Sequence, residues 1–389
     1  MPTDHLQRLD SYMNEYQLDI LFCRLPENIV YLTGTYPVLG LSIAAYQPGR
    51  FIALLLPEFE FTRQPDDRIR VDAFPNGHLG DPPVLQAYAA WLEQLGQKYQ
   101  PQPKSIGMEV DISIAAPAFN ASEMLLPGRD WMELLKTKFP QAALADCLPA
   151  LEKSRAVKDE DEITQMRKAG EIANFGLAAL GGSLQPGMTE VEAAALVEKE
   201  IRTRGTGWQG AQLVQAFAQV TGGPEGSYRQ SMLTPSSAKR MEMGDLVMIE
   251  LGVCVDGYWS DLTRTYTIGK PSKAQVEAYN AVWDAQQNAA QALREGNCWG
   301  APDLAARSLL QSRGYGKYFK HGTGHGIGCR YHESVPRLLP GAEEKLAAGM
   351  VTSVEPGIYI PGFGGIRIED NLVVTAADPR WLSTPAERW

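Results

Sequence analysis

Residues 249–266, IELGVCVDGYWSDLTRTY, contain the pattern that decides the fold. Side chains of alternating character lie on both sides of a central Val-Asp-Gly, so this stretch is predicted to form two strands joined by a turn. Glu250 is expected on the face away from the β-branched side chains of the first strand. A four-residue loop from Cys254 to Gly257 is expected to place Glu250 directly opposite Asp261 across the hairpin.

A second hairpin repeats this acidic arrangement, because Glu355 and Glu369 flank the turn sequence PGFGG. In both hairpins the first glutamate follows a turn glycine by six residues: Glu250 follows Gly244, and Glu355 follows Gly349. The two glycines are 105 residues apart, which predicts a duplicated α/β unit of about that length. If this repeat relates the two hairpins, four carboxylates meet at one centre.

Carboxylates at such short range repel one another unless cations or protons lie between them. Two divalent ions would neutralise the charge of about −4 that four carboxylates carry. His325, in the glycine-rich segment HGTGHGIG, adds one imidazole as a further ligand. The predicted ligand set is rich in oxygen and has one nitrogen, which favours manganese and allows cobalt or zinc.

Each of these residues also has a simpler interpretation. A single glutamate in a strand is most often solvated, and an Asp-Gly pair is usually only a turn. His321 and His325 have the spacing of a helical zinc motif, but their segment is rich in glycine and has no glutamate directly after the first histidine. The metal prediction therefore depends on the whole set, which offers several acids on rigid strands together with an imidazole.

The N-terminal part of the chain has a different pattern. Helical periodicity, as in residues 84–99, alternates with short apolar runs such as residues 51–57, and this alternation is typical of an α/β domain. The charged segment at residues 152–162 is either an exposed linker or the solvated face of a helix. We therefore expect two domains, residues 1–153 and 154–389.

The composition limits the classes of partner. The 36 basic and 46 acidic residues give a net charge of −10, which opposes binding to nucleic acid or to an anionic membrane. No apolar run approaches the roughly 20 residues of a membrane-spanning helix, and the first residues lack the pattern of a secretory signal. Five scattered cysteines without a C-x-x-C spacing argue against a disulfide framework. A cytoplasmic protein is therefore expected.

Four segments carry a resemblance to a known family. Residues 249–266, HGTGHGIGCRYHESVP (321–336), SVEPGIY (353–359) and GIRIEDNLVV (365–374) resemble the signature blocks of the pita-bread metallopeptidases, the family of Xaa-Pro dipeptidases (prolidases), aminopeptidase P and methionine aminopeptidase. The similarity covers roughly residues 155–389. The preceding part resembles the creatinase/prolidase N-terminal domain, which methionine aminopeptidases lack. The resemblance implies an α/β (α+β) fold, with a creatinase-type N-terminal domain and a pita-bread C-terminal domain with a pseudo-two-fold repeat.

The resemblance also implies which residues bind metal. Asp261 and Glu369 match the two carboxylates that bridge the metals in the family. Glu250 matches the bidentate ligand of one metal. The ligands of the other metal are matched by His325 and Glu355.

Three further roles follow from the resemblance. Glu355 also stands where the family has its proton-shuttling carboxylate. His332 matches a histidine that contacts the substrate and the tetrahedral intermediate, and Arg367 matches an arginine that steadies the bridging Glu369 and can meet a substrate carboxylate. His321 is expected to support the glycine-rich loop.

The chain departs from the family pattern at two places. Glu250 stands where the family usually has aspartate, so one ligand side chain is longer by a methylene group. Prolidases and aminopeptidase P also carry a histidine in the segment that matches roughly residues 220–240, where this chain has none. Tyr228, Arg229 and Gln230 are the candidates to take its place.

The resemblance implies hydrolysis of Xaa-Pro peptide bonds by a hydroxide held between two divalent ions. The expected partner is a proline-containing dipeptide, with an aminopeptidase acting on longer peptides as the alternative, and the chain length resembles that of homodimeric bacterial prolidases. Two other interpretations stay open, namely a member of the fold with changed chemistry, such as an amidinohydrolase or a lyase, and a non-catalytic binding protein. The five intact ligands speak against both.

Overall fold

The structure is a computed structural model, and it describes residues 4–38, 40–58, 60, 67–76, 78, 80–98, 102–110, 128–229 and 234–389. Contacts between residues divide the chain into two compact units, Met1–Arg155 and Ala156–Trp389. Among the described helices, none is both long enough and apolar enough to span a membrane.

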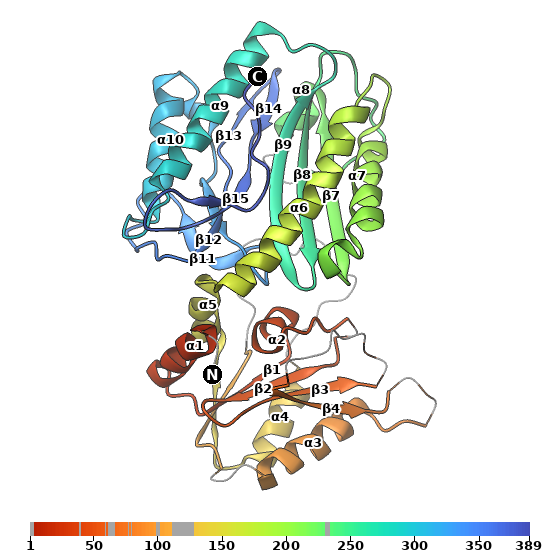
Figure 1. Ribbon diagram of the computed structural model, residues 1–389, viewed down its shortest axis with the longest axis vertical. Helices are drawn as coiled ribbons and strands as arrows, with labels where there is room; N and C mark the ends of the chain where they lie inside the picture. The colour runs from red at the N-terminus through yellow and green to blue at the C-terminus, as the bar shows by residue number, and fades with distance from the viewer. Residues whose placement is uncertain are drawn as a thin grey trace. The chain divides into compact units, whose positions relative to one another are not determined.

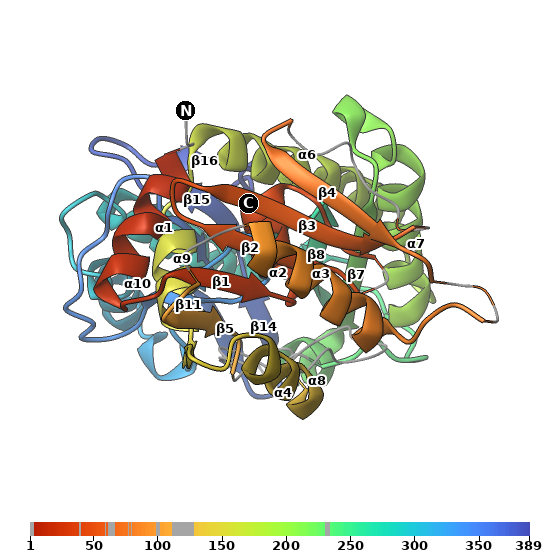
Figure 2. The ribbon, with the colours of Figure 1, turned by 90° about the horizontal axis from the view of Figure 1, so that it is seen from below.

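The first unit alternates helices and strands, as its sequence pattern predicts. In chain order its elements are α1 (Asp4–Glu15), β1 (Ile20–Cys23), α2 (Pro26–Thr33), β2 (Ile43–Gln47), β3 (Phe51–Pro57), β4 (Ile69–Phe74), α3 (Val84–Lys98), β5 (Ser105–Met108), α4 (Arg129–Lys138), β6 (Ala143–Asp146) and α5 (Leu148–Ala156). The strands form one mixed sheet in the order β4-β3-β2-β1-β5-β6. Helices α3 and α4 cover one face of this sheet, where Phe22, Trp91 and Trp131 meet edge to face in the core (Figure 2).

The second unit contains two similar sets of elements, each with two helices followed by antiparallel strands. The first set is α6 (Glu160–Ser183), α7 (Glu190–Gly205), η1 (Trp208–Gly210), β7 (Val214–Gly222), α8 (Gly223–Arg229), β8 (Leu246–Val255) and β9 (Tyr258–Thr267). The second set is α9 (Lys273–Ala292), α10 (Gly300–Ser312), η3 (Gly316–Tyr318), β10 (Gly324–Gly326), β11 (Glu333–Leu338), β12 (Val351–Val354), β13 (Gly357–Ile360), β14 (Gly364–Arg367), β15 (Asp370–Val373) and β16 (Arg380–Trp381). In Figure 1, helices α6 and α7 lie on one side of the strands, and α9 and α10 lie on the other.

The helix starts predicted from the sequence are confirmed. Thr189 and Glu192 form a reciprocal capping box at the start of α7, and Ser272 and Gln275 form another at the start of α9. Asp159 caps α6 in the same way. Each box satisfies backbone N–H groups that the first helical turn leaves without a partner.

The predicted repeat is visible in the strands and in the cores. Strand β8 lies between β7 and β9, and β12 lies between β10 and β15. Gly244 and Gly349, which precede these central strands, have left-handed φ values of 90° and 84°. In the first half, Val247, Ile249 and Leu251 of β8 pack with apolar side chains of α6 and α7 in one hydrophobic cluster. In the second half, apolar side chains of α9 and α10 pack with those of β12, β13 and β14.

The predicted loop length of the first hairpin is wrong. Instead of a four-residue loop from Cys254, the chain makes a two-residue turn at Asp256 and Gly257, and Val255 pairs with Tyr258. Asp256 has φ 51° and Gly257 has φ 95°. A tight turn with positive φ at both central residues matches the twist of the flanking strands, and an Asp-Gly pair adopts it readily.

This turn changes the register that the sequence predicts for the acidic pair. Glu250 lies opposite Thr263, and Asp261 lies opposite Gly252, so the two carboxylates are diagonal neighbours instead of directly opposed. Because the shift covers an even number of residues, both side chains still point to the same face of the sheet. Diagonal neighbours on one face remain within reach of each other.

The second hairpin is continuous in register. Strand β12 pairs with β15, and β13 pairs with β14 in the same alignment. Glu355 lies between β12 and β13, and Glu369 lies between β14 and β15, so this alignment places the two glutamates opposite each other.

Candidate active site

The structure brings all five predicted metal ligands together. Ligand atoms of Glu250, Asp261 and Glu369 lie within 4.8 Å of one another, and so do those of His325, Glu355 and Glu369. Glu369 therefore belongs to both groups. The first half of the repeat supplies two of these side chains, and the second half supplies three.

The site has a buried side and a partly open side. Glu250, Asp261 and Glu369 are buried, whereas the side chains of His325 and Glu355 are 17% and 18% exposed. The Nε2 atom of His325 lies 3.4 Å from Asp261 Oδ2 and 3.5 Å from Glu355 Oε1. Its Nδ1 atom lies 2.9 Å from the carbonyl oxygen of the next residue and donates to it, so Nε2 is free to act as a ligand.

Two of the buried carboxyl groups are electrostatically unfavourable as anions. Burial, followed by the nearby charges of Glu250 and Glu355, raises the pKa of Asp261 well above its usual range. The pKa of Glu369 is also well above its usual range, because of burial first and then the charges of Asp261, Glu355 and Glu250. Cations placed among these carboxylates would offset their mutual repulsion and stabilise the ionised forms despite burial.

Three possible hydrogen-bond donors surround Glu250, and two of them are hydroxyls that also lie beside a second carboxylate. Tyr331 Oη lies 2.8 Å from Glu250 Oε1, Thr263 Oγ1 lies 2.8 Å from Glu250 Oε2, and the Arg367 guanidinium also donates to Oε2. Burial raises the pKa of Glu250, but the charge of Arg367 and these hydrogen bonds outweigh it, so its pKa lies below the usual value. Glu250 therefore carries a negative charge that the surrounding protein stabilises.

Arg367 contacts a different glutamate from the one that the family resemblance implies. Its guanidinium donates to Glu250, to Thr263 Oγ1 at 3.0 Å and to the Tyr359 hydroxyl at 2.8 Å, whereas the hydroxyl of Thr263 lies 2.7 Å from Glu369 Oε2. The hydrogen-bond link from Arg367 to Glu369 thus runs through Thr263, while the charge of the guanidinium also acts to lower the pKa of Glu369. Because the arginine is 3% exposed, its contacts are with the protein.

His332 lies beside the metal-ligand histidine. The rings of His332 and His325 have centroids 4.4 Å apart, and His332, His325 and Asp261 form a further group of ligand atoms within 4.8 Å. Burial, followed by the proximity of His325, lowers the pKa of His332 to about 3. A neutral imidazole keeps one N–H donor for a neighbouring group.

His321 and Tyr228 lie near the start of the glycine-rich loop. His321 Nδ1 donates to the Gly322 carbonyl oxygen at 2.8 Å, and its Nε2 lies 2.9 Å from the Tyr359 hydroxyl. Both contacts agree with a supporting role for His321. Tyr228, at the end of α8, has its hydroxyl 3.5 Å from Lys320 Nζ, while Gln230 lies outside the described residues.

Sequence reasoning missed three residues of the site. Thr263 shares a face with Asp261 by strand alternation and could have been found once the two-residue turn was recognised. Tyr331 comes from the second half of the repeat, and its contact with Glu250 depends on how the two halves meet. Tyr359 contacts Arg367 within the hairpin of β13 and β14. The sequence contains no local signal for the long-range contact of Tyr331.

One atom shows that the site fits a metal. Glu369 Oε1 is buried and has no hydrogen-bond partner among the described residues. A buried carboxylate oxygen without a donor is costly, and a bound cation satisfies it. Carboxylate oxygens with one imidazole form a donor set suited to divalent ions.

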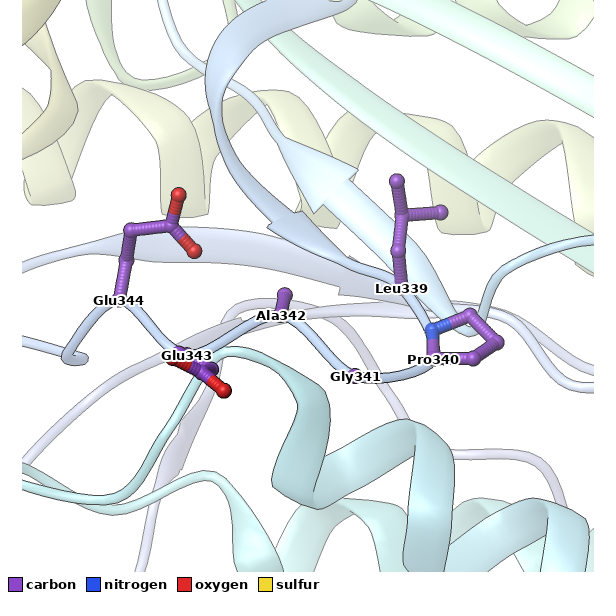
Figure 3. A pocket seen from close by; sticks show the side chains of 6 residues that line it. All are labelled: Leu339, Pro340, Gly341, Ala342, Glu343 and Glu344. Atoms are coloured by element: carbon purple, nitrogen blue, oxygen red, sulfur yellow. The ribbon is translucent and has the colours of Figure 1, made fainter.

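A shallow surface pocket lies apart from these residues. It has a volume of about 730 Å³ and is lined by the loop after β11, Leu339, Pro340, Gly341, Ala342, Glu343 and Glu344 (Figure 3). None of the five predicted metal ligands lines this pocket. It is therefore not the candidate active site.

Comparisons with known proteins agree with this geometry. Residues 164–376 match the model of metallopeptidase family M24, and residues 5–157 match the creatinase/prolidase N-terminal domain. An Xaa-Pro dipeptidase of Pyrococcus furiosus is 30% identical over 387 residues, covering 99% of each chain.

Two solved structures are also similar over nearly the whole chain. The prolidase from Pyrococcus horikoshii has a TM-score of 0.75 and 29% identity, and the alignment covers 99% of each chain. The X-Pro aminopeptidase from Thermotoga maritima has a TM-score of 0.77 and 26% identity, covering 98% of this chain and 99% of that one. The chain therefore belongs to metallopeptidase family M24 and is a metallopeptidase that works with divalent metal ions.

Proposed function

We propose that the protein hydrolyses the peptide bond of Xaa-Pro dipeptides. The observation that carries the proposal is the gathering of three buried acids, one of which has an unpartnered oxygen, beside a partly open edge formed by His325 and Glu355. The relatives named Xaa-Pro dipeptidase and prolidase support the substrate class. The proposed metal ligands are Glu250, Asp261, His325, Glu355 and Glu369.

We propose that two ions bind, because the ligand atoms form two groups that share Glu369. Asp261 also faces both groups, since it belongs to the Glu250 group and lies 3.4 Å from His325 Nε2. Manganese is the first choice for an oxygen-rich set with one nitrogen, and cobalt and zinc are the alternatives.

When bound, divalent ions polarise a carbonyl group and lower the pKa of a water molecule. In the proposed mechanism, Glu355 moves the proton of the attacking water. Its Oε1 accepts from Ser353 Oγ at 3.2 Å, and its side chain reaches the partly open edge of the site. Glu355 takes the proton as the water oxygen attacks the scissile carbonyl carbon, then delivers it to the proline nitrogen as the C–N bond breaks.

In the proposed mechanism, His332 stabilises the charge that develops on the carbonyl oxygen. Its neutral ring lies against His325 and keeps an N–H for donation. Arg367 is a positioning residue in this scheme, since its guanidinium is buried against Glu250, Thr263 and Tyr359 and has no exposed face for a substrate carboxylate.

A second candidate is removal of the first residue from longer peptides that begin Xaa-Pro. The similarity to the X-Pro aminopeptidase from Thermotoga maritima favours it, because that alignment also covers nearly the whole of both chains. The two activities differ in whether a residue after proline is tolerated.

Three further points belong to the proposal. Residues 154–389 form the catalytic domain, and residues 1–153 form the N-terminal domain of the same enzyme. The protein is a homodimer, which sedimentation equilibrium can measure. It works in the cytoplasm, where thiols stay reduced, and none of the five cysteines forms a disulfide.

The proposal is tested by elemental analysis of the dialysed protein, followed by assays of Met-Pro, Met-Ala and an Xaa-Pro tripeptide with added Mn²⁺. We expect bound metal and cleavage of Met-Pro but not Met-Ala, and loss of both metal and activity in Asp261→Ala. Cleavage of the tripeptide alone would assign the aminopeptidase activity. Bound metal without cleavage of any peptide, as an amidinohydrolase or lyase would show, contradicts the proposal, and so does a protein that binds no metal.

A further inference from the structure

Tyr331 connects the two halves of the repeat at the metal site. It lies in the loop between β10 and β11 of the second half, yet its hydroxyl contacts two carboxylates of the first half. Its Oη atom is 2.8 Å from Glu250 Oε1 and 2.5 Å from Asp261 Oδ1. The phenol oxygen is therefore within hydrogen-bond distance of one oxygen of each of two proposed ligands, and its single proton can be donated to either of them.

The ring of Tyr331 is fixed by its aromatic neighbours. Its centroid lies 5.0 Å from that of Phe217, 5.4 Å from that of Trp259 and 4.6 Å from that of His332, and all three rings are steeply inclined to it. Rings packed in this way contribute attraction beyond their buried area. The hydroxyl is thus presented to the carboxylates from a rigid support.

The carboxylate oxygens of Glu250 and Asp261 differ in the protein groups that they contact. Both oxygens of Glu250 lie within hydrogen-bond distance of protein donors: the Tyr331 hydroxyl at Oε1, and the Arg367 guanidinium with the Thr263 hydroxyl at Oε2. By contrast, Asp261 Oδ2 points to His325 Nε2. The donors therefore fix the orientation of the Glu250 carboxylate before any ion arrives.

We propose that Tyr331 is a positioning residue that compensates for the length of Glu250. A glutamate has one more rotatable bond than the aspartate usual at this position, and immobilising that bond costs conformational entropy on ion binding. A hydroxyl that already holds Oε1 lowers this cost, since the carboxylate is ordered in the metal-free protein. Glu250 and Tyr331 therefore act as a matched pair, an inference that rests on the proposed metal site.

The test is Tyr331→Phe, which removes the hydroxyl and keeps the ring and its aromatic contacts. The matched control is Tyr266→Phe, because Tyr266 on β9 donates to the Leu177 carbonyl oxygen at 3.1 Å and contacts none of the ligands. We expect Tyr331→Phe to weaken Mn²⁺ binding, measured by equilibrium dialysis with elemental analysis, about 10- to 100-fold. The control should bind Mn²⁺ as the wild type does.

Two further readouts separate positioning from a merely structural role. The absorption spectrum of the Co²⁺-loaded protein should change in Tyr331→Phe and not in Tyr266→Phe, because it reports the geometry of the ligands. In the Glu250→Asp background, the same Tyr331→Phe change should cost less affinity than in the wild type, since the shorter arm has less freedom to restrain.

The outcomes distinguish this inference from the proposed function. Wild-type Mn²⁺ affinity and an unchanged Co²⁺ spectrum in Tyr331→Phe would overturn only the positioning role. The same would follow if Tyr331→Phe reduced Mn²⁺ affinity by the same factor in the wild-type and Glu250→Asp backgrounds. A wild-type protein that binds neither Mn²⁺ nor Co²⁺ would overturn the metal site and this inference together.

Discussion

Replacing Arg367 by methionine should destabilise the metal-free protein far more than the metal-loaded protein. Arg367 is buried among the acids, donates to Glu250 and has its Nε 4.0 Å from Glu355 Oε2. Methionine has a similar length and no charge. The substitution leaves Glu250, Asp261, Glu355 and Glu369 in place without this guanidinium.

The expected magnitude follows from the burial of the pair. Removing one partner of a buried ion pair costs about 3–5 kcal/mol, because the other charge is left uncompensated. In a domain of about 150–250 residues, each kcal/mol shifts Tm by about 2–4 °C, so the metal-free variant should melt roughly 10 °C lower. When ions neutralise the same carboxylates, at least about half of this decrease in Tm should be restored.

Differential scanning calorimetry with a chelator and with excess Mn²⁺ measures both effects. The control is Arg380→Met, since Arg380 pairs with Glu160 at 2.8 Å on the exposed surface and should cost no more than about 1 kcal/mol in either condition. Equal decreases in the Tm of Arg367→Met with and without Mn²⁺ would refute the reasoning. It would also be refuted if, without metal, the Tm of Arg367→Met fell no further than that of Arg380→Met.

Three other substitutions test separate parts of the site. Glu355→Gln keeps the size of the side chain but cannot carry the proton, so kcat for Met-Pro should fall about 10²- to 10⁴-fold in a continuous hydrolysis assay. His332→Gln should retain its Mn²⁺ in elemental analysis and lose about 10²- to 10³-fold in kcat. Gly324→Ala should lower the free energy of unfolding by about 1–3 kcal/mol in urea titrations, because the added Cβ would lie 2.0 Å from the backbone oxygen of Ser353.

The faces of the strands could be predicted from the sequence, but the register could not. The alternation of Val247, Ile249 and Leu251 correctly separates the core face from the face of Glu250. The loop length was predicted wrongly, since an Asp-Gly pair is compatible with turns of several lengths. The error did not affect the face of Asp261, because it moved the partner by an even number of residues.

The hydrogen-bond donors around the carboxylates could not be predicted from the sequence, because they come from distant parts of the chain. The contact between Tyr331 and Glu250 joins residues 81 positions apart, and that between Arg367 and Glu250 joins residues 117 apart. Such pairs are set by how two packed halves meet, which no local pattern records. The family resemblance assigned Arg367 to Glu369, and the structure shows why an indirect link exists, since Thr263 lies between them.

Each half of the second unit has a hydrophobic cluster of its own, so neither half needs the acidic centre in order to bury apolar surface. The centre can therefore be destabilising by itself, as the raised pKa values of Asp261 and Glu369 indicate. In the metal-free form a few donors, namely Arg367, Thr263 and Tyr331, lie within hydrogen-bond distance of Glu250. Glu369 Oε1 is buried without such a donor, so a cation that binds there also stabilises the fold.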